Sequence, residues 1–450
     1  MPEIRVPADQ VFPILKNNIL VDGFHIVIDL EKSHGSVIVD ALTGKEYIDC
    51  YTYFATLPVG HNHPKMVDGD FRASLMRAAL ANPANSDIYS QEFAAFVKTF
   101  RRIAVPREFT HLFFIAGGAL AVENAMKAAF DWKAQKNRAK GIEGGADKIL
   151  HFREAFHGRS GYTLSVTNTE PLKIRDFPRF DWPRVSNPKI TFPMDEAAVA
   201  TAEAQSVREI EEAFARDPSG IAAILIEPIQ CEGGDNHFRP EFMGRLRALA
   251  DEHEALLIFD EVQTGMGVTG TMWAFEQLGA TPDLVSFGKK TQVCGIMSTG
   301  RIDDVESNVF RVSSRINSTW GGNLVDMVRC ARYLEIIQED KLVRSAATVG
   351  AAFKAGLVEL QQEFEQVTNA RGRGLLLAFD VPDGESRELL RQRCWANGLA
   401  TLACGPRSVR FRPSLTFTEE DVRRSLEILR KQLKTTAKLR TKPKPMPDTL

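Results

Sequence analysis

An acidic and a basic side chain each follow a short apolar segment in the middle of the chain. Residues 256–259 (LLIF) precede Asp260, and residues 284–287 (LVSF) precede Gly288 and Lys289. Short apolar runs of this kind are typical of strands buried in a sheet. Ligands of open α/β sheets bind beyond the carboxyl ends of the strands, so Asp260 and Lys289 are predicted to face a ligand.

A carboxylate and an amine in this arrangement suit an enzyme that uses pyridoxal 5′-phosphate (PLP). In such enzymes a lysine forms a Schiff base with the cofactor, and an acid against the pyridine nitrogen keeps the ring an electron sink. The lysine needs a lowered pKa, so that its free amine can attack and act as a base. The alternative is a solvated loop at Lys289 and Lys290, with Asp260 an ordinary carboxylate at the end of a strand.

A glycine pair, Gly117 and Gly118, lies between a predicted strand at residues 111–115 and a predicted helix. Unpaired N–H groups and the dipole at a helix N-terminus favour a phosphate, and glycine lets a ligand approach closely. The pair could equally serve a steric purpose in a tight turn. Two histidines, His61 and His63, could suggest a metal, but no further ligand cluster accompanies them, so no metal site is expected.

The order of the predicted elements indicates an α/β protein with two domains. Strands and helices alternate over residues 66–325, which predicts a large domain with a mostly parallel central sheet flanked by helices. Residues 326–436 predict a smaller α+β domain, in which residues 372–379 are interpreted as one strand. Residues 1–65 are predicted to form an N-terminal arm with a small hairpin, and the polar, basic, proline-rich residues 437–450 a mobile tail.

The composition is that of a soluble globular protein, with 44% apolar and 25% charged residues among 450. A formal net charge of −2 creates no global attraction to nucleic acid or to a membrane. No uncharged apolar run approaches the roughly 18 residues of a membrane helix, and no signal peptide is visible at the start. Six cysteines without CxxC spacing suggest free thiols. We therefore expect a cytoplasmic protein with neither nucleic acid nor membrane as a partner.

Several motifs resemble those of the class III PLP-dependent aminotransferases and occur in the same order over nearly the whole chain. They are GHNHP at 60–64, DEVQTG at 260–265, TPD at 281–283 with GK at 288–289, and VRFRP at 409–413. The resemblance implies the fold of PLP-dependent transferases of fold type I. It also implies a homodimer whose active sites are shared between the subunits.

The resemblance implies a role for each matching position of the cofactor site. The glycine pair would bind the phosphate, Phe156 would stack on the ring, and Gln263 would lie near the phenolic oxygen. Asp260 would face the pyridine nitrogen, and Thr319 would reach the phosphate from the other subunit. The implied cofactor-binding residues are Gly117, Gly118, Phe156, Asp260, Gln263, Lys289 and Thr319.

Two candidates remain for the catalytic lysine. Lys289 stands six positions after Asp283, and this spacing together with its separation from Gln263 favours it. The family usually shows a glycine pair four residues after the lysine. Here residues 293–295 read VCG, a spacing that fits Lys290 slightly better.

Departures from the family pattern bear on the amine donor. Val268 replaces a common arginine, and the loop at 291–295 is not a glycine run. Together with NSTWGGN at 317–323, these features are similar to the lysine 6-aminotransferase branch. The implied ping-pong reaction transfers the ε-amine of L-lysine to 2-oxoglutarate, giving L-glutamate and 2-aminoadipate 6-semialdehyde, which cyclises to piperideine-6-carboxylate. The alternatives are another ω-amine donor (ornithine, 4-aminobutyrate or a diamine) and a non-catalytic binding protein of the same fold.

An ω-aminotransferase must accept an amine without an adjacent carboxylate and then an oxo acid that has one. The resemblance implies that Arg159 binds the distant carboxylate of both substrates, and that Arg410 binds the α-carboxylate of 2-oxoglutarate. Glu232 would neutralise Arg410 while lysine is bound, because a buried guanidinium without a counterion is costly. The implied substrate-binding residues are Arg159, Glu232, Asn317 and Arg410. Without the resemblance, surface salt bridges and a loop carboxylate would explain the three charged residues.

Overall fold

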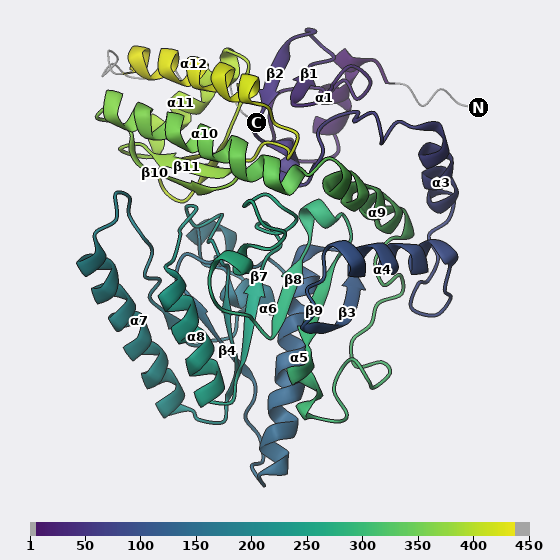
Figure 1. Cartoon of the computed structure of the whole chain (residues 1–450), viewed down its shortest axis with the longest axis vertical. Coiled ribbons are helices and arrows are strands. Elements are labelled where there is room, and N and C mark those ends of the chain that lie inside the picture. Colours follow the sequence, from purple (N-terminus) through teal and green to yellow (C-terminus); the bar gives the residue numbers. More distant parts are fainter. Residues whose placement is uncertain (1–5, 437–450) are drawn as a thin grey trace.

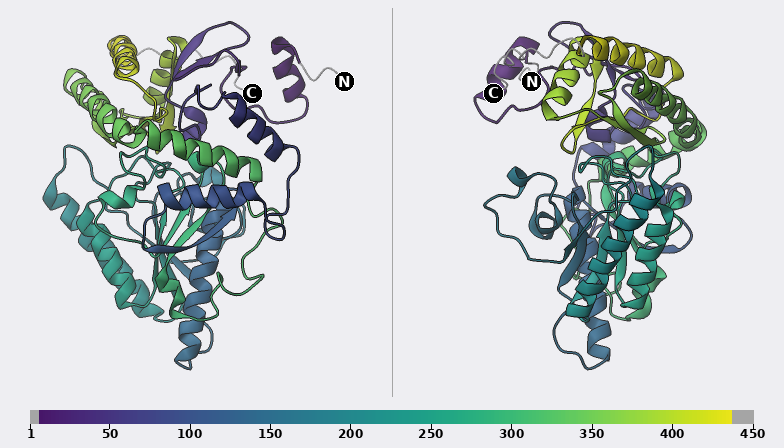
Figure 2. Two further views of the ribbon diagram at one scale, coloured as in Figure 1. Left: turned by 45° about the vertical axis from the view of Figure 1, so that its right-hand side comes forward. Right: turned by 90° about the vertical axis from the view of Figure 1, so that its left-hand side faces the viewer.

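The protein consists of a large body around a central sheet and a smaller body that carries the C-terminal helices (Figure 1). The structure is a computed structural model that describes residues 6–436, so the tail predicted at 437–450 lies outside the described residues. Helix α9 (Leu324–Glu339) lies where the two bodies meet, and the bodies are stacked one above the other in the turned views as well (Figure 2). The domain boundaries given above stay a prediction.

In the described part of the chain, the central sheet has seven strands in the order β3-β9-β8-β7-β6-β4-β5. Neighbouring strands pair in parallel except at β9, which runs antiparallel to both β3 and β8. The strands are β3 (Phe109–Ile115), β4 (Lys148–Phe152), β5 (Arg184–Val185), β6 (Ile221–Ile226), β7 (Leu256–Asp260), β8 (Leu284–Phe287) and β9 (Cys294–Thr299). This is the mostly parallel sheet that the alternating pattern predicts.

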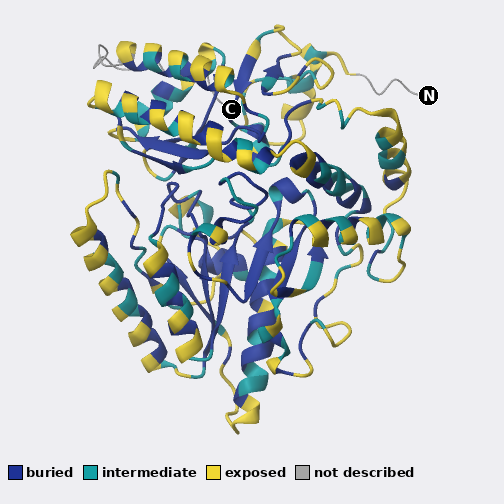
Figure 3. Cartoon of the chain, viewed as in Figure 1, coloured by how far each residue is buried: buried dark blue, intermediate teal, exposed yellow. Residues whose placement is uncertain are grey.

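Helices cover both faces of this sheet, so its strands are buried on both sides (Figure 3). In β6, Ile224 and Ile226 face the core shared with α4 and α8, whereas Ala223 and Leu225 face α5. The alternation follows from the two-residue period of a strand and explains why both sets of positions are apolar. The helices of this body are α4 (Gln91–Ile103), α5 (Gly118–Ala139), α6 (Gly161–Val166), α7 (Glu196–Arg216) and α8 (Pro240–Glu252).

The smaller body is built on an antiparallel sheet in the order β10-β11-β14-β13. A further sheet pairs the N-terminal hairpin, β1 (Val37–Val39) and β2 (Glu46–Asp49), with β12 (Leu399–Ala400), so the arm packs on the C-terminal part. The other strands are β10 (Thr368–Arg373), β11 (Leu376–Asp380), β13 (Leu402–Cys404) and β14 (Ser408–Phe411). The helices are α10 (Leu342–Glu363), α11 (Gly384–Ala396) and α12 (Glu419–Thr436), with α1 (Ala8–Lys16), α2 (Thr52–Ala55) and α3 (Gly69–Ala79) in the N-terminal part.

Two local predictions were wrong. Residues 372–379 do not form one strand but the end of β10 and most of β11, because Gly374 adopts φ +53° and turns the chain between them. Residues 291–295 are not only a loop, since Cys294 and Gly295 begin β9. Strand β9 (CGIMST) carries no alternation of apolar and polar residues, and long-range pairing with β3 and β8 is what forms it.

Candidate active site

The carboxyl ends of parallel strands and the N-terminus of α5 enclose a cavity of about 250 Å³. The contributing residues lie at the start of α5, at the last position of a strand, or within a few positions after it. Parallel strands end at the same edge of the sheet, so these residues meet there. The cavity walls include Gly118, Phe156, Glu227, Asp260, Gln263 and Lys289.

Asp260, the last residue of β7, is held by three hydrogen bonds. Its Oδ2 accepts from His157 Nδ1 at 2.8 Å, and its Oδ1 accepts from Val262 N and Ser286 Oγ, both at 3.1 Å. His157 is buried, and its Nε2 has no hydrogen-bond partner within the described residues. Sequence reasoning missed His157, and the available signal was its position directly after Phe156.

The two adjacent lysines lie in different environments. Lys289 adopts φ +52° at the start of the 3-10 helix η3 (Lys289–Thr291), and it lines the cavity. Burial is the main cause that lowers the pKa of Lys289 below the ordinary lysine value, and the positive charge of Arg410 is the second. Lys290 instead donates to the Gln263 carbonyl oxygen at 2.8 Å, and burial lowers its pKa to about 7. Of these two amines, the one on Lys289 faces the cavity.

The start of α5 forms one wall of the cavity. Gly117 precedes the helix with φ +107°, a conformation that favours glycine, and Gly118 and Ala119 line the cavity. A side chain at Gly118 would come within 3.0 Å of Val262 Cγ1. The first N–H groups of a helix have no partner inside it, and the helix dipole adds positive charge there. This wall therefore suits an anion such as a phosphate.

Glu227 ties the segment that carries Phe156 to the loop after β6. Its Oε1 accepts from Phe156 N at 2.9 Å, and its Oε2 accepts from Cys231 N at 3.1 Å. Burial, reinforced by Asp260, raises the pKa of Glu227 well above its ordinary value. The Phe156 ring is thereby positioned at the cavity by a carboxyl group that is itself buried.

Arg410, on β14 of the smaller body, reaches the cavity residues of the larger one. Its Nη2 donates to Glu232 Oε2 at 2.7 Å, and its Nη1 donates to Gln263 Oε1 at 3.1 Å. Burial by itself would raise the pKa of Glu232, but Arg410 and Lys173 outweigh it and lower that pKa to about 2. Glu232 is therefore a charged partner of Arg410. Sequence reasoning missed Lys173, and no motif marks it.

Three of the predicted residues that do not line this cavity are exposed to solvent. Arg159, Asn317 and Thr319 are exposed, and none of them lines it. Within residues 6–436, Arg159 forms no ion pair with a carboxylate. The loop that carries Asn317 and Thr319 is anchored by its backbone, because Asn85 Nδ2 donates to the Trp320 carbonyl oxygen at 2.9 Å.

The sequence profile of class III aminotransferases matches residues 20–433. The chain belongs to the class III aminotransferases. It is 50% identical to the L-lysine-epsilon aminotransferase of Mycobacterium tuberculosis (strain ATCC 25618 / H37Rv) over 428 residues, 94% of this chain and 95% of that relative. Its identity to the L-lysine-epsilon aminotransferase of Streptomyces clavuligerus is 49% over 427 residues, 94% of this chain and 93% of that one. A solved structure of the M. tuberculosis lysine aminotransferase in the internal aldimine form matches with a TM-score of 0.94 and 50% identity, covering 96% of this chain and 100% of that one.

This family match confirms the predicted fold type I and the dependence on PLP. The cavity of the aminotransferase fits the cofactor, since one wall suits a phosphate and the other walls offer a carboxylate and an amine. His157 also lines the cavity, and its buried Nε2 has no hydrogen-bond partner in the described range. This nitrogen is a further polar atom of the cavity wall. The residues that would hold PLP are Gly117, Gly118, Phe156, Asp260, Gln263 and Lys289.

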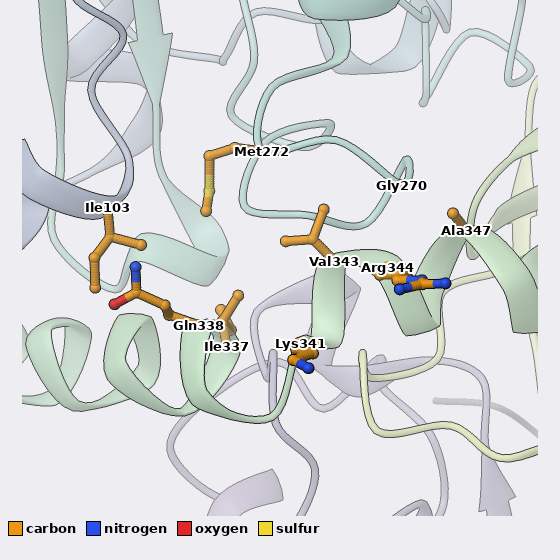
Figure 4. A pocket seen from close by; sticks show the side chains of 9 residues that line it. All are labelled: Ile103, Gly270, Met272, Ile337, Gln338, Lys341, Val343, Arg344 and Ala347. Atoms are coloured by element: carbon orange, nitrogen blue, oxygen red, sulfur yellow. The ribbon is translucent and has the colours of Figure 1, made fainter.

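Another cavity of this aminotransferase, of about 470 Å³, lies beside the junction of α9 and α10 (Figure 4). Ile103, Met272 and Val343 give it apolar walls, and Lys341 and Arg344 add positive charge. None of the residues predicted for the active site lines it. We therefore place no part of the transamination chemistry there.

The described residues contain no group of three or more His, Cys, Asp or Glu side chains arranged to hold a metal ion. In the same range of this aminotransferase, no helix has the length and apolar character needed to cross a membrane.

Proposed function

We propose that this aminotransferase transfers the ε-amine of L-lysine to 2-oxoglutarate. The products are L-glutamate and 2-aminoadipate 6-semialdehyde, which cyclises to piperideine-6-carboxylate. The observation that carries the proposal is the ion pair between Glu232 and Arg410, 2.7 Å apart, beside the cavity residue Gln263. The names of the two relatives at 49% and 50% identity support the choice of L-lysine as donor.

The buried Arg410 allows one site to accept two different substrates. While the donor amine is bound, no carboxylate lies beside its reacting carbon, and Glu232 neutralises Arg410. When 2-oxoglutarate enters, its α-carboxylate binds Arg410 in place of Glu232 as a bidentate pair. Arg410 is 1% exposed, and an unpaired guanidinium would be costly there, so the exchange keeps it paired in both half-reactions. Arg159 binds the distant carboxylate of either substrate.

Lys289 is the residue to which we assign proton transfer. Bound PLP supplies an aldehyde that takes up the amine and a ring that takes up electrons. The amine of Lys289, freed by the incoming donor, removes a proton from the ε-carbon of lysine, and its lowered pKa favours the unprotonated form that this step needs. Asp260, oriented by His157, supplies the negative charge for the pyridine nitrogen. The two half-reactions follow one another, so the kinetics are ping-pong.

A homodimer with shared active sites is part of the proposal. Asn317 and Thr319 are exposed and do not line the cavity of their own chain, so the substrate and phosphate contacts assigned to them require a second copy. The anchored backbone of their loop would hold both side chains ready for that copy. Thr319 is assigned to the phosphate and Asn317 to the substrate.

The protein is further proposed to be cytoplasmic, with small molecules and a second copy of itself as its partners. Its six cysteines are free and buried. Free thiols of this kind are usual in proteins of a reducing compartment.

A panel of amine donors tests the proposed reaction. Purified enzyme with PLP is given 2-oxoglutarate and L-lysine, ornithine, 4-aminobutyrate or a diamine, and glutamate is measured together with the cyclic imine that 2-aminobenzaldehyde reports. Mass spectrometry separates the six-membered imine of lysine from the five-membered imine of ornithine. We expect the highest kcat/KM with L-lysine. Glutamate formed from another donor, with no imine from lysine, would refute the proposal.

A further inference from the structure

Glu232 is shared between two cations. Its Oε2 accepts from Arg410 Nη2 at 2.7 Å, and its Oε1 accepts from Lys173 Nζ at 3.0 Å. Lys173 ends the 3-10 helix η1 (Pro171–Lys173), and its side chain is 15% exposed. The same ammonium lies 5.3 Å from the centre of the Phe156 ring and 2.9 Å from Glu170 Oε1. Lys173 therefore stands between a cavity wall and the ion pair of Glu232.

The backbone around Glu232 is held in place by the smaller body. The carbonyl oxygen of Glu232 accepts from Gly405 N at 2.9 Å. Arg371 donates through Nε to the Asp235 carbonyl oxygen at 3.0 Å, and Arg412 pairs with the Asp235 carboxylate, with both side chains fully buried. A loop anchored in this way does not need to shift when Glu232 releases Arg410. Rotation of the Glu232 side chain is sufficient.

We propose that Lys173 is the second partner of Glu232 and retains its carboxylate whenever 2-oxoglutarate takes over Arg410. This inference rests on the proposed function, because it requires Glu232 to leave Arg410. One carboxylate oxygen already contacts Lys173, so Glu232 keeps one charge-assisted hydrogen bond when it loses the one from Arg410. Without Lys173, the released carboxylate would lose its remaining partner in a site where its side chain is only 23% exposed. Lys173 is in this sense a positioning residue for the acceptor half-reaction.

Arg391 is the competing candidate for this role. It lines, together with Glu232, a cavity of about 540 Å³, and its buried Nε has no partner in the described chain. Arg391 Nη1, however, already donates to Glu388 Oε2 at 2.6 Å, and no contact joins it to Glu232. Lys173 has both the existing contact and an exposed second partner, Glu170, that solvent can replace. The geometry therefore favours Lys173.

The test measures the two half-reactions separately in Lys173→Met. The acceptor half-reaction starts from enzyme loaded with pyridoxamine phosphate and follows the absorbance change on adding 2-oxoglutarate, so it does not depend on which amine is the donor. We expect its kcat/KM to fall by about tenfold or more, the cost of one charge-assisted hydrogen bond. The lysine half-reaction should change by less than about threefold, since Arg410 keeps Glu232 there. Glutarate, a dicarboxylate that cannot react, should bind the PLP form more weakly by a similar factor in calorimetry.

Three further variants decide between a positioning role and a merely structural one. Lys173→Arg keeps the charge and should restore most of the acceptor half-reaction. Glu170→Gln is the matched control, because it removes the exposed partner of Lys173 and leaves Glu232 untouched, and both half-reactions should stay unchanged. An equal loss in both half-reactions, no loss in either, or a selective loss in Arg391→Met in place of Lys173→Met would overturn the proposal. Failure of L-lysine as donor in the wild type would refute the proposed function alone, because the acceptor half-reaction would still report on Lys173.

Discussion

His157 Nδ1 and Asp260 Oδ2 are 2.8 Å apart, and both side chains are almost completely buried. The carboxylate accepts, so Nδ1 carries the proton of this contact. Two further donors, Val262 N and Ser286 Oγ, bond the other carboxylate oxygen. The Asp260 carboxylate is therefore held by donors from three parts of the chain, namely the segment after β4, the turn after β7 and strand β8.

His157→Leu should lower kcat at saturating PLP by about 10- to 100-fold, because a buried carboxylate loses one charge-assisted hydrogen bond. His157→Asn places an amide N–H near the position of Nδ1 and should recover part of the loss. Steady-state kinetics with L-lysine and 2-oxoglutarate provide the measurement. Equal activity of the Leu variant and the wild type would show that Asp260 needs no support from His157.

Lys289→Ala should lose turnover by about 10²- to 10⁴-fold, since it removes the group assigned to proton transfer. It should also lose the Schiff-base absorbance of the cofactor that borohydride removes by reduction. Lys290→Ala is the adjacent control and should keep that absorbance, because Lys290 Nζ bonds the Gln263 carbonyl oxygen and does not line the cavity. The reverse result would transfer the catalytic role to Lys290.

Arg159→Met should raise the KM of L-lysine and of 2-oxoglutarate together by about 10- to 100-fold, with a smaller effect on kcat, because both substrates carry the distant carboxylate. The free energy of unfolding should change by less than about 0.5 kcal/mol, since Arg159 is exposed and has no carboxylate partner in the described range. Arg153→Met, another exposed arginine of the same segment, is the control. A rise in the KM of only one substrate would contradict a shared binding role.

Hybrid dimers test whether Thr319 acts on the neighbouring active site. Chains with Lys289→Ala and chains with Thr319→Ala are co-expressed under different tags, and the mixed dimer is purified. If Thr319 serves the partner, one of the two sites in the mixed dimer has both residues, and activity returns to about half that of the wild type. If Thr319 served its own chain, no site would be complete, and the mixed dimer would stay at the level of the two parents.

Glu261, the neighbour of Asp260, should make stability depend on pH. Burial raises its pKa from the ordinary 4.5 to about 7, although Thr264 Oγ1, Ala274 N and Phe275 N all donate to it. The folded protein therefore binds this proton more tightly than the unfolded chain. The contribution to stability is fully present below about pH 4.5 and is lost as the pH rises through about 7. The melting temperature of Glu261→Gln should fall less between pH 5 and 8 than that of the wild type, by about 1–3 °C. Parallel curves for the two proteins would show that Glu261 does not titrate in this range.

Local patterns were sufficient to predict the α/β fold and the placement of Asp260 and Lys289 in the site. Short apolar runs predicted β7 and β8, and both strands are buried where expected. The rule that parallel strands end at one edge then brought Asp260 and Lys289 together without any knowledge of the tertiary structure. Strand β9 escaped prediction because its formation depends on strands that are distant in the sequence, not on a pattern of its own.

The sequence by itself determined that the chain forms an α/β sheet with an acid, an amine and a helix start at its carboxyl edge, because strand burial and helix ends leave local signals. Only the tertiary structure separated Lys289 from Lys290, since the direction of two adjacent side chains depends on a backbone turn at φ +52° that composition does not reveal. It alone placed Lys173 beside Glu232, a contact between residues 59 positions apart. It also showed the contact between Glu232 and Arg410, across 178 positions and two bodies of the fold, which the family resemblance implied but no local pattern indicated. Such pairs are made by packing, and a local sequence pattern cannot contain them.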